Sequence, residues 1–166
     1  MSPARRLAVV GLLAALSMCC SADPQSTKGE ELMSNPDLLR AFAERYTAAW
    51  CSQDASSVAA FFSPEGSLRV NDGEPAVGRA AITDVAQGFM TAFPDMAVHM
   101  DDLVIEGDRA EYRWTLVGTN TGPGGTGHRV HISGYEVWKI GIDGLIEESQ
   151  GHFDSAAYQH QIEHGE

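Results

Sequence analysis

The first half of the chain has apolar residues at the spacing of amphipathic helices. The clearest stripe follows Asn35 and Pro36, which suit the N-cap and the first turn of a helix, and it continues as far as Trp50. Similar patterns predict a short helix after Asp54 and a longer one that ends at Phe93. The helices predicted in this way, with one more near the C-terminus, start at Asn35, Asp54, Gly78 and Asp154.

From Met96 to Phe153 the pattern changes to the apolar–polar alternation of strands, interrupted by glycine-containing turns. The expected strands are a short one near Leu68 and Val70 and four longer ones over 97–106, 109–119, 128–140 and 145–153. Helices followed by such a meander predict an α+β fold, a cone-shaped curved antiparallel sheet packed on three N-terminal helices plus a short C-terminal helix. A cone of this kind leaves an apolar cavity at its open end.

The N-terminal segment predicts an export signal. Arg5 and Arg6 precede an apolar run over 7–16 that is too short to span a bilayer. Two cleavage schemes stay open: lipid attachment at Cys19, which gives a cell-envelope lipoprotein held to the membrane by lipid alone, or cleavage after Ala22, which gives a secreted protein. The chain then divides into a signal over 1–22, a flexible tether over 23–34, one domain over 35–162 and a tail over 163–166.

Composition narrows the range of partners. A chain of 166 residues suffices for one domain, and a net charge of −12 without a basic patch argues against nucleic acid. Three cysteines make no disulfide framework, and Cys51 is predicted to be a small core residue. His160 and His164 share a helix face, but zinc needs three or four converging ligands. We therefore expect no metal centre and no cofactor.

Glu136 is the most informative residue for function. Strand periodicity puts it on the inward face of the strand over 128–140, where it is the only charge among apolar residues. Burial disfavours the ionised carboxylate and predicts a raised pKa, suited to proton transfer. Tyr46 lies on the apolar stripe of the first helix, and its hydroxyl needs a partner. For both residues a purely structural role remains the alternative.

Several short stretches, in their order and spacing, resemble the SnoaL-like branch of the nuclear transport factor 2-like superfamily over roughly residues 36–162. They are Glu44–Trp50, Phe93–Asp95, Arg113–Thr115, Gly118–Gly122, Asp143–Glu148 and Phe153–Asp154. The resemblance implies the cystatin-like cone and a homodimer formed through the outer sheet face. It also implies that the cyclases' catalytic aspartate falls on Gly151 and their histidine on Glu136. The related ketosteroid isomerases' donor tyrosine falls on Tyr46, and their base falls near Val70.

These features predict a pocket for a small, mostly apolar or aromatic ligand. Glu136 and Tyr46 are the candidate catalytic residues, and the candidate ligand-binding residues are Trp50, Phe62, Phe89 and Trp138. If the protein is an enzyme, the resemblance implies proton transfer next to a carbonyl, of the polyketide-cyclase, ester-cyclase or isomerase kind. Gly151 and Val70 favour the alternative, a non-catalytic binding or interaction domain at the cell surface.

Overall fold

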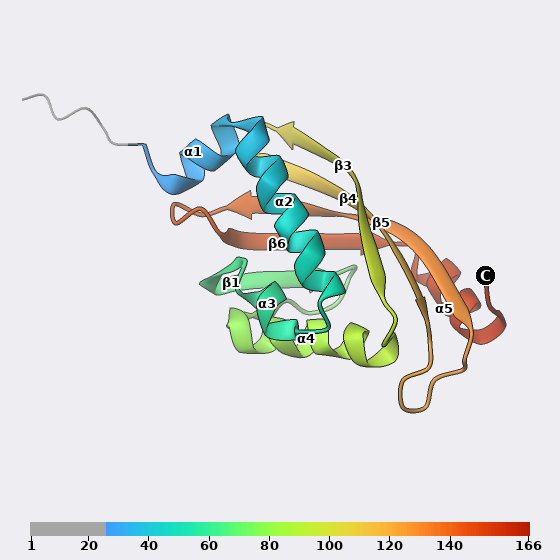
Figure 1. Cartoon of the computed structure of the whole chain (residues 1–166). Coiled ribbons are helices and arrows are strands. Elements are labelled where there is room, and N and C mark those ends of the chain that lie inside the picture. The colour runs from blue at the N-terminus through green and yellow to red at the C-terminus, as the bar shows by residue number, and fades with distance from the viewer. Residues whose placement is uncertain (1–25) are drawn as a thin grey trace, which may run out of the picture.

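A curved sheet and the long helix that crosses it determine the shape of the molecule (Figure 1). The computed structural model describes residues 26–166. In chain order the elements are α1 (Lys28–Ser34), α2 (Pro36–Cys51), α3 (Ala55–Ala59), β1 (Phe62–Val70), β2 (Ala76–Val77), α4 (Gly78–Ala92), β3 (Ala97–Glu106), β4 (Arg109–Thr119), β5 (Arg129–Ile140), β6 (Ile146–Phe153) and α5 (Ser155–His164). The strands form one sheet in the order β2-β1-β6-β5-β4-β3. The predicted α+β class is confirmed.

The sheet is mixed, whereas the sequence predicted an antiparallel one. Strands β3 to β6 form an antiparallel meander, but β1 pairs with β6 in parallel. No hairpin joins these two strands, since α4 and the whole meander separate them, so chain proximity does not fix their relative direction. β1 also begins earlier than expected and carries a register shift between Phe62 and Ser67. There Gly66 lies so close to β6 that a Cβ would stand 2.7 Å from the Ile146 carbonyl oxygen.

Helix α2 packs its apolar stripe against the concave face of the sheet, and α3 and α4 cover the β1 edge (Figure 1). The Asn35 side chain accepts hydrogen bonds from two backbone N–H groups of the first turn, as its N-cap position predicts. Tyr46, fully buried, packs edge-on to Trp138 at 5.1 Å, and Trp138 stacks on Tyr112 at 4.8 Å. Aromatic pairs of this kind stabilise a core by about 0.5–1.5 kcal/mol each beyond burial.

Two stretches that carried the family resemblance meet at one end of the sheet. The Asp95 carboxylate accepts hydrogen bonds from the Thr119 N–H at 2.6 Å and from its hydroxyl at 2.7 Å. A Cβ at Gly118 would approach Phe93 Cβ to 3.1 Å, so the strand passes closely over the end of α4. These residues therefore join α4 to β4 and serve the fold, not the pocket.

The part of the predicted tether that the structure describes is a folded helix, which corrects that prediction. Thr27 and Glu30 form a capping box that starts α1. Gly29 lies against the β5–β6 turn, where a Cβ would be 2.2 Å from the Gly141 carbonyl oxygen. The predicted tail is also held, because Glu166 contacts both Arg129 and His131. An isolated helix this short is at most marginally stable in water. The sequence therefore gave no indication that α1 forms and packs against the β5–β6 turn.

Cys51 differs from its prediction as well. It is exposed at the end of α2, where its thiol donates to the Val98 carbonyl and accepts from the Val98 N–H. The predicted signal and the lipid site at Cys19 lie outside the described residues. Within residues 26–166, no helix is both long and apolar enough to cross a membrane.

Asp154 begins α5 as its N-cap: one carboxylate oxygen accepts from the N–H groups of Ala156 and Ala157, each at 2.9 Å. Asp154→Ala should therefore lower the free energy of unfolding by about 1 kcal/mol, because two N–H groups lose their acceptor. Asp154→Asn should be nearly silent, since an amide oxygen caps equally well. Denaturant unfolding measures both. Equal losses in the two variants would show that the charge of Asp154, and not its capping oxygen, matters.

Candidate functional site

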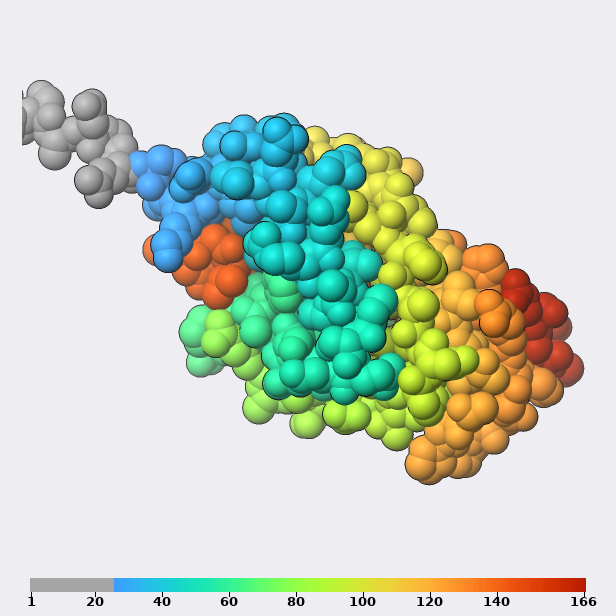
Figure 2. Space-filling view, in the orientation of Figure 1, coloured from blue at the N-terminus to red at the C-terminus, as the bar shows by residue number. Residues whose placement is uncertain are grey.

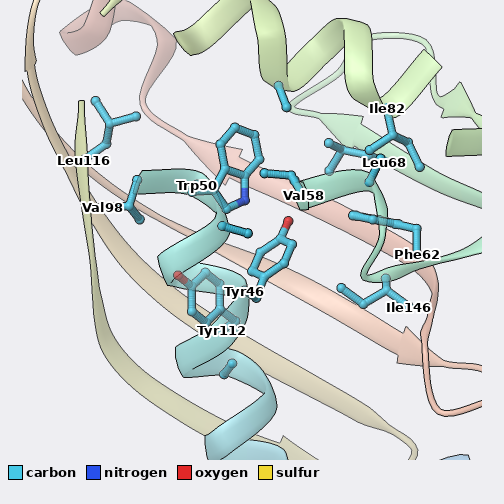
Figure 3. Packing of buried hydrophobic residues seen from close by; sticks show 14 of the residues in the cluster. Tyr46, Trp50, Val58, Phe62, Leu68, Ile82, Val98, Tyr112, Leu116 and Ile146 are labelled. Atoms are coloured by element: carbon cyan, nitrogen blue, oxygen red, sulfur yellow. The ribbon is translucent and has the colours of Figure 1, made fainter. Parts of the chain in front are cut away.

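A pocket lies between the helices and the inner face of the sheet, and its surface is almost wholly apolar. Its lining residues are Trp50, Leu68, Val70, Phe89, Val98, Tyr112, Trp114, Leu116, Glu136, Gly151 and Phe153. Figure 3 shows Trp50 of α2 between Val98 and Leu116 on one side and Leu68 on the other. The cavity volume of about 60 Å³ equals that of about two water molecules in the liquid.

Glu136 is the one charged side chain of this lining, and it is held by one of its two oxygens. Its Oε2 accepts hydrogen bonds from the Tyr46 hydroxyl at 3.0 Å, the Trp138 indole N–H at 2.9 Å and the Ser149 hydroxyl at 2.7 Å. Among the described residues none donates to Oε1. The side chain is 7% exposed, so the free oxygen belongs to the pocket.

The electrostatics of the site follow from burial. Desolvation raises the pKa of Glu136, and the hydrogen bonds from Trp138, Ser149 and Tyr46 offset part of the rise. Burial also raises the pKa of Tyr46 well above its usual range, with the adjacent Glu136 charge adding to the effect. Burial raises the pKa of Tyr112 in the same way. Because burial makes both phenols harder to deprotonate, a proton-transfer role in this cluster falls to Glu136.

Strand alternation explains how these groups come together. In β5 the residues on either side of Glu136 point outward, and Glu136 faces α2 with Trp138 two positions on. Register then puts Gly151 of β6 directly beside Glu136, and Ser149 beside Trp138. Because residues two apart in a strand share a face, Ser149 and Gly151 both lie on the pocket side.

The structure places the predicted site residues at different distances from the pocket. Trp50 and Phe89 line it beside Glu136. Tyr46 does not line it: the side chain is 0% exposed and its hydroxyl lies behind Glu136. Phe62 and Trp138 are not lining residues either, although both were expected to meet the ligand. They share the correct face but lie further along their strands, under α2.

The two positions where the resemblance implies an acid, Gly151 and Val70, contribute space and no carboxylate. Gly151 and Val70 pair with each other across β6 and β1 and both line the pocket. A Cβ at Gly151 would contact Glu136 Cγ at 3.6 Å, so the missing side chain leaves room beside Glu136. His152 cannot substitute for the missing acid, because it faces outward and packs on Tyr135 at 4.9 Å.

Ser149 and Tyr112 are two of the contributors that sequence reasoning missed. Ser149 carries no distinctive local pattern, and its role depends on the pairing of β5 with β6. Tyr112 lines the pocket with its ring while its hydroxyl lies 2.7 Å from Thr47 of α2. The only indication for Tyr112 in the sequence was its place among the apolar positions of the strand predicted over 109–119. Over residues 26–166, no group of three or more His, Cys, Asp or Glu side chains forms a candidate metal site.

The comparisons with known proteins show the family and agree with the fold. The family model described as SnoaL-like polyketide cyclase matches residues 40–162, so the chain belongs to that family. Among proteins of curated function, none matches the sequence.

Solved structures with the same fold include three that are informative here. A putative hydroxylase, AclR, from Streptomyces galilaeus is 26% identical, with a TM-score of 0.64 over 75% of this chain and 80% of its own. A ketosteroid isomerase-like protein from Catenulispora acidiphila, in complex with trimethylamine, is 14% identical with a TM-score of 0.65 over 74% and 92%. TerC, co-crystallised with polyporic acid, is 17% identical with a TM-score of 0.62 over 75% and 97%. The last two likenesses show the fold alone.

Glu136→Gln should make the protein more resistant to unfolding at neutral pH. Burial raises the folded-state pKa above the unfolded value, so this carboxyl contributes stability at low pH that is lost as pH rises through the folded-state pKa. The variant should therefore gain free energy of unfolding relative to wild type as pH rises from about 4 towards 7. Denaturant unfolding over a pH series measures this difference.

Glu148→Gln is the matched control, since it removes a carboxylate from the neighbouring strand. The hydrogen bond from Gln150 and the charge of Arg109 lower the pKa of Glu148. Its contribution is thus present at neutral pH and lost as pH falls through the lowered folded-state pKa, so this variant should show the opposite sign. A large loss of stability in Glu136→Gln at neutral pH would mean that the charge holds the core together.

Proposed function

We propose that this protein binds a small, mostly apolar molecule in the pocket, with Glu136 as the polar group that the ligand meets. The observation that carries the proposal is the asymmetry of that carboxyl group. Three donors saturate Oε2, while Oε1 is left to an otherwise apolar cavity. Membership of a polyketide cyclase family, and the small molecules bound by the Catenulispora protein and by TerC, support the same reading.

A reaction at this site would be proton transfer next to a carbonyl group. Glu136 would take a proton from the α-carbon at Oε1 and return it to a second carbon or to oxygen, leaving no net change in the enzyme. Tyr46 would act as a positioning residue, because its hydroxyl is committed to Oε2 and lies outside the lining. The absence of an acid at Gly151 and Val70 favours the second candidate, binding without catalysis.

Intrinsic fluorescence gives a direct test, because Trp50 and Trp114 line the pocket and Trp138 donates to Glu136. A panel of small apolar compounds should include some that change this fluorescence saturably. Glu136→Gln should weaken their binding about tenfold, the range for losing a hydrogen bond to a charged group, and Glu148→Gln should leave it unchanged. Deuterium exchange at the α-carbon of bound ketones then separates catalysis from binding. No saturable ligand, or equal binding by all three proteins, would contradict the proposal.

We also propose that the protein is exported, on the basis of Arg5, Arg6 and the apolar run over 7–16. Intact mass spectrometry of membrane and secreted fractions from the native host should find a mature chain that begins at lipid-modified Cys19 or at Asp23. An abundant cellular form that retains Met1 would contradict this.

A further inference from the structure

The pocket offers negative charge and aromatic rings to its occupant. Within residues 26–166, none of the lining side chains is Lys, Arg or His, so Glu136 has no cationic partner there. The donors on Oε2 fit an ionised carboxylate, which only accepts hydrogen bonds. A buried carboxylate is most stable when an opposite charge lies beside it. The position that remains for such a charge is next to Oε1.

The rest of the lining also favours a cation. Five of its side chains are aromatic: Trp50, Phe89, Tyr112, Trp114 and Phe153. The face of an aromatic ring is negative, and it attracts a cation that lies within about 6 Å of its centre. These rings make up five of the eleven lining residues, so the walls of the pocket are largely aromatic. The net charge of −12 adds a long-range attraction for cations.

The number of free hydrogen-bond acceptors in the pocket limits the kind of cation that can be buried there. A lysine-like ammonium carries three N–H groups, and each needs an acceptor once water is removed. The almost wholly apolar surface offers Oε1 as the free acceptor. A tertiary ammonium has one N–H and a quaternary ammonium has none, so either can be buried without an unpaired donor. The small volume of about 60 Å³ restricts the alkyl groups of such a cation to short ones such as methyl.

We propose that the ligand of this pocket is a small alkylammonium cation, tertiary or quaternary, with its charge beside Glu136 Oε1 and its alkyl groups against the aromatic rings. This inference rests on the proposed function, from which it takes the pocket as the binding site, and it names the ligand class. The titratable groups that face Glu136 are Tyr46 from α2 and Tyr112 from β4. Both phenols stay neutral because burial raises their pKa above the usual range, so Glu136 alone controls the charge of the site.

Tetramethylammonium is the best probe, because its charge does not change with pH. Its binding is measured by tryptophan fluorescence at fixed ionic strength, beside the neutral compounds tert-butanol, which has the same shape, and butanone, which carries a carbonyl. We expect tetramethylammonium to bind at least about tenfold more tightly than either neutral compound. Its affinity should fall as pH is lowered through the pKa of Glu136. Glu136→Gln should weaken binding about tenfold or more, while Glu148→Gln, which changes the net charge equally, should not.

The outcomes separate this inference from the proposed function. Equal or tighter binding of butanone or tert-butanol would contradict the proposal of a cationic ligand. It would still agree with the proposed function, an apolar binding pocket. Equal weakening by Glu136→Gln and Glu148→Gln would contradict the cationic ligand as well, because attraction by overall charge would explain the result. If none of the three probes binds, the alkylammonium ligand is excluded, and the compound panel alone decides the proposed function. Because the pH series uses wild-type protein, the test holds even if Glu136→Gln fails to fold.

Discussion

The hydrogen bond between the Tyr46 hydroxyl and Glu136 Oε2 is the interaction on which the site depends. It joins α2 to the sheet, and the same oxygen receives donors from β5 and β6. A carboxylate buried among aromatic rings would be strongly destabilising without such partners. The position of α2 over the sheet and the direction of the Glu136 side chain are therefore set together.

That arrangement has a consequence for the pocket. Three neutral donors on one oxygen stabilise the charge without cancelling it, and they turn the other oxygen towards the cavity. Gly151 keeps the space beside it open, since a side chain there would fill the volume next to Glu136. The site is thus an apolar cavity with a single oriented carboxylate, one oxygen of which is left without a donor among the described residues.

The division between pocket and core was the weakest part of the sequence-based prediction. Alternation along β5 identified Glu136 and Trp138 as inward-facing, and both are buried. It could not distinguish them further, because Trp138 lies under α2 while Glu136 reaches the cavity. Figure 2 shows α1 and α2 (blue to cyan) lying over part of that side of the molecule, with later strands (yellow to orange) visible beside them. Which inward residues remain accessible depends on where the helices end, and periodicity carries no such information.

The sequence by itself determined the elements other than α1 and β2, because helix caps such as Asn35 and Asp154 and the two periodicities act over a few residues. It also determined that Glu136 is buried and is the only charged residue on the inward face of its strand. Only the tertiary structure decided the parallel pairing of β1 with β6, the docking of α1 and the placement of Ser149 beside Glu136. These depend on contacts between residues distant in the chain, and such contacts follow from how the sheet curves around α2 and not from any local pattern.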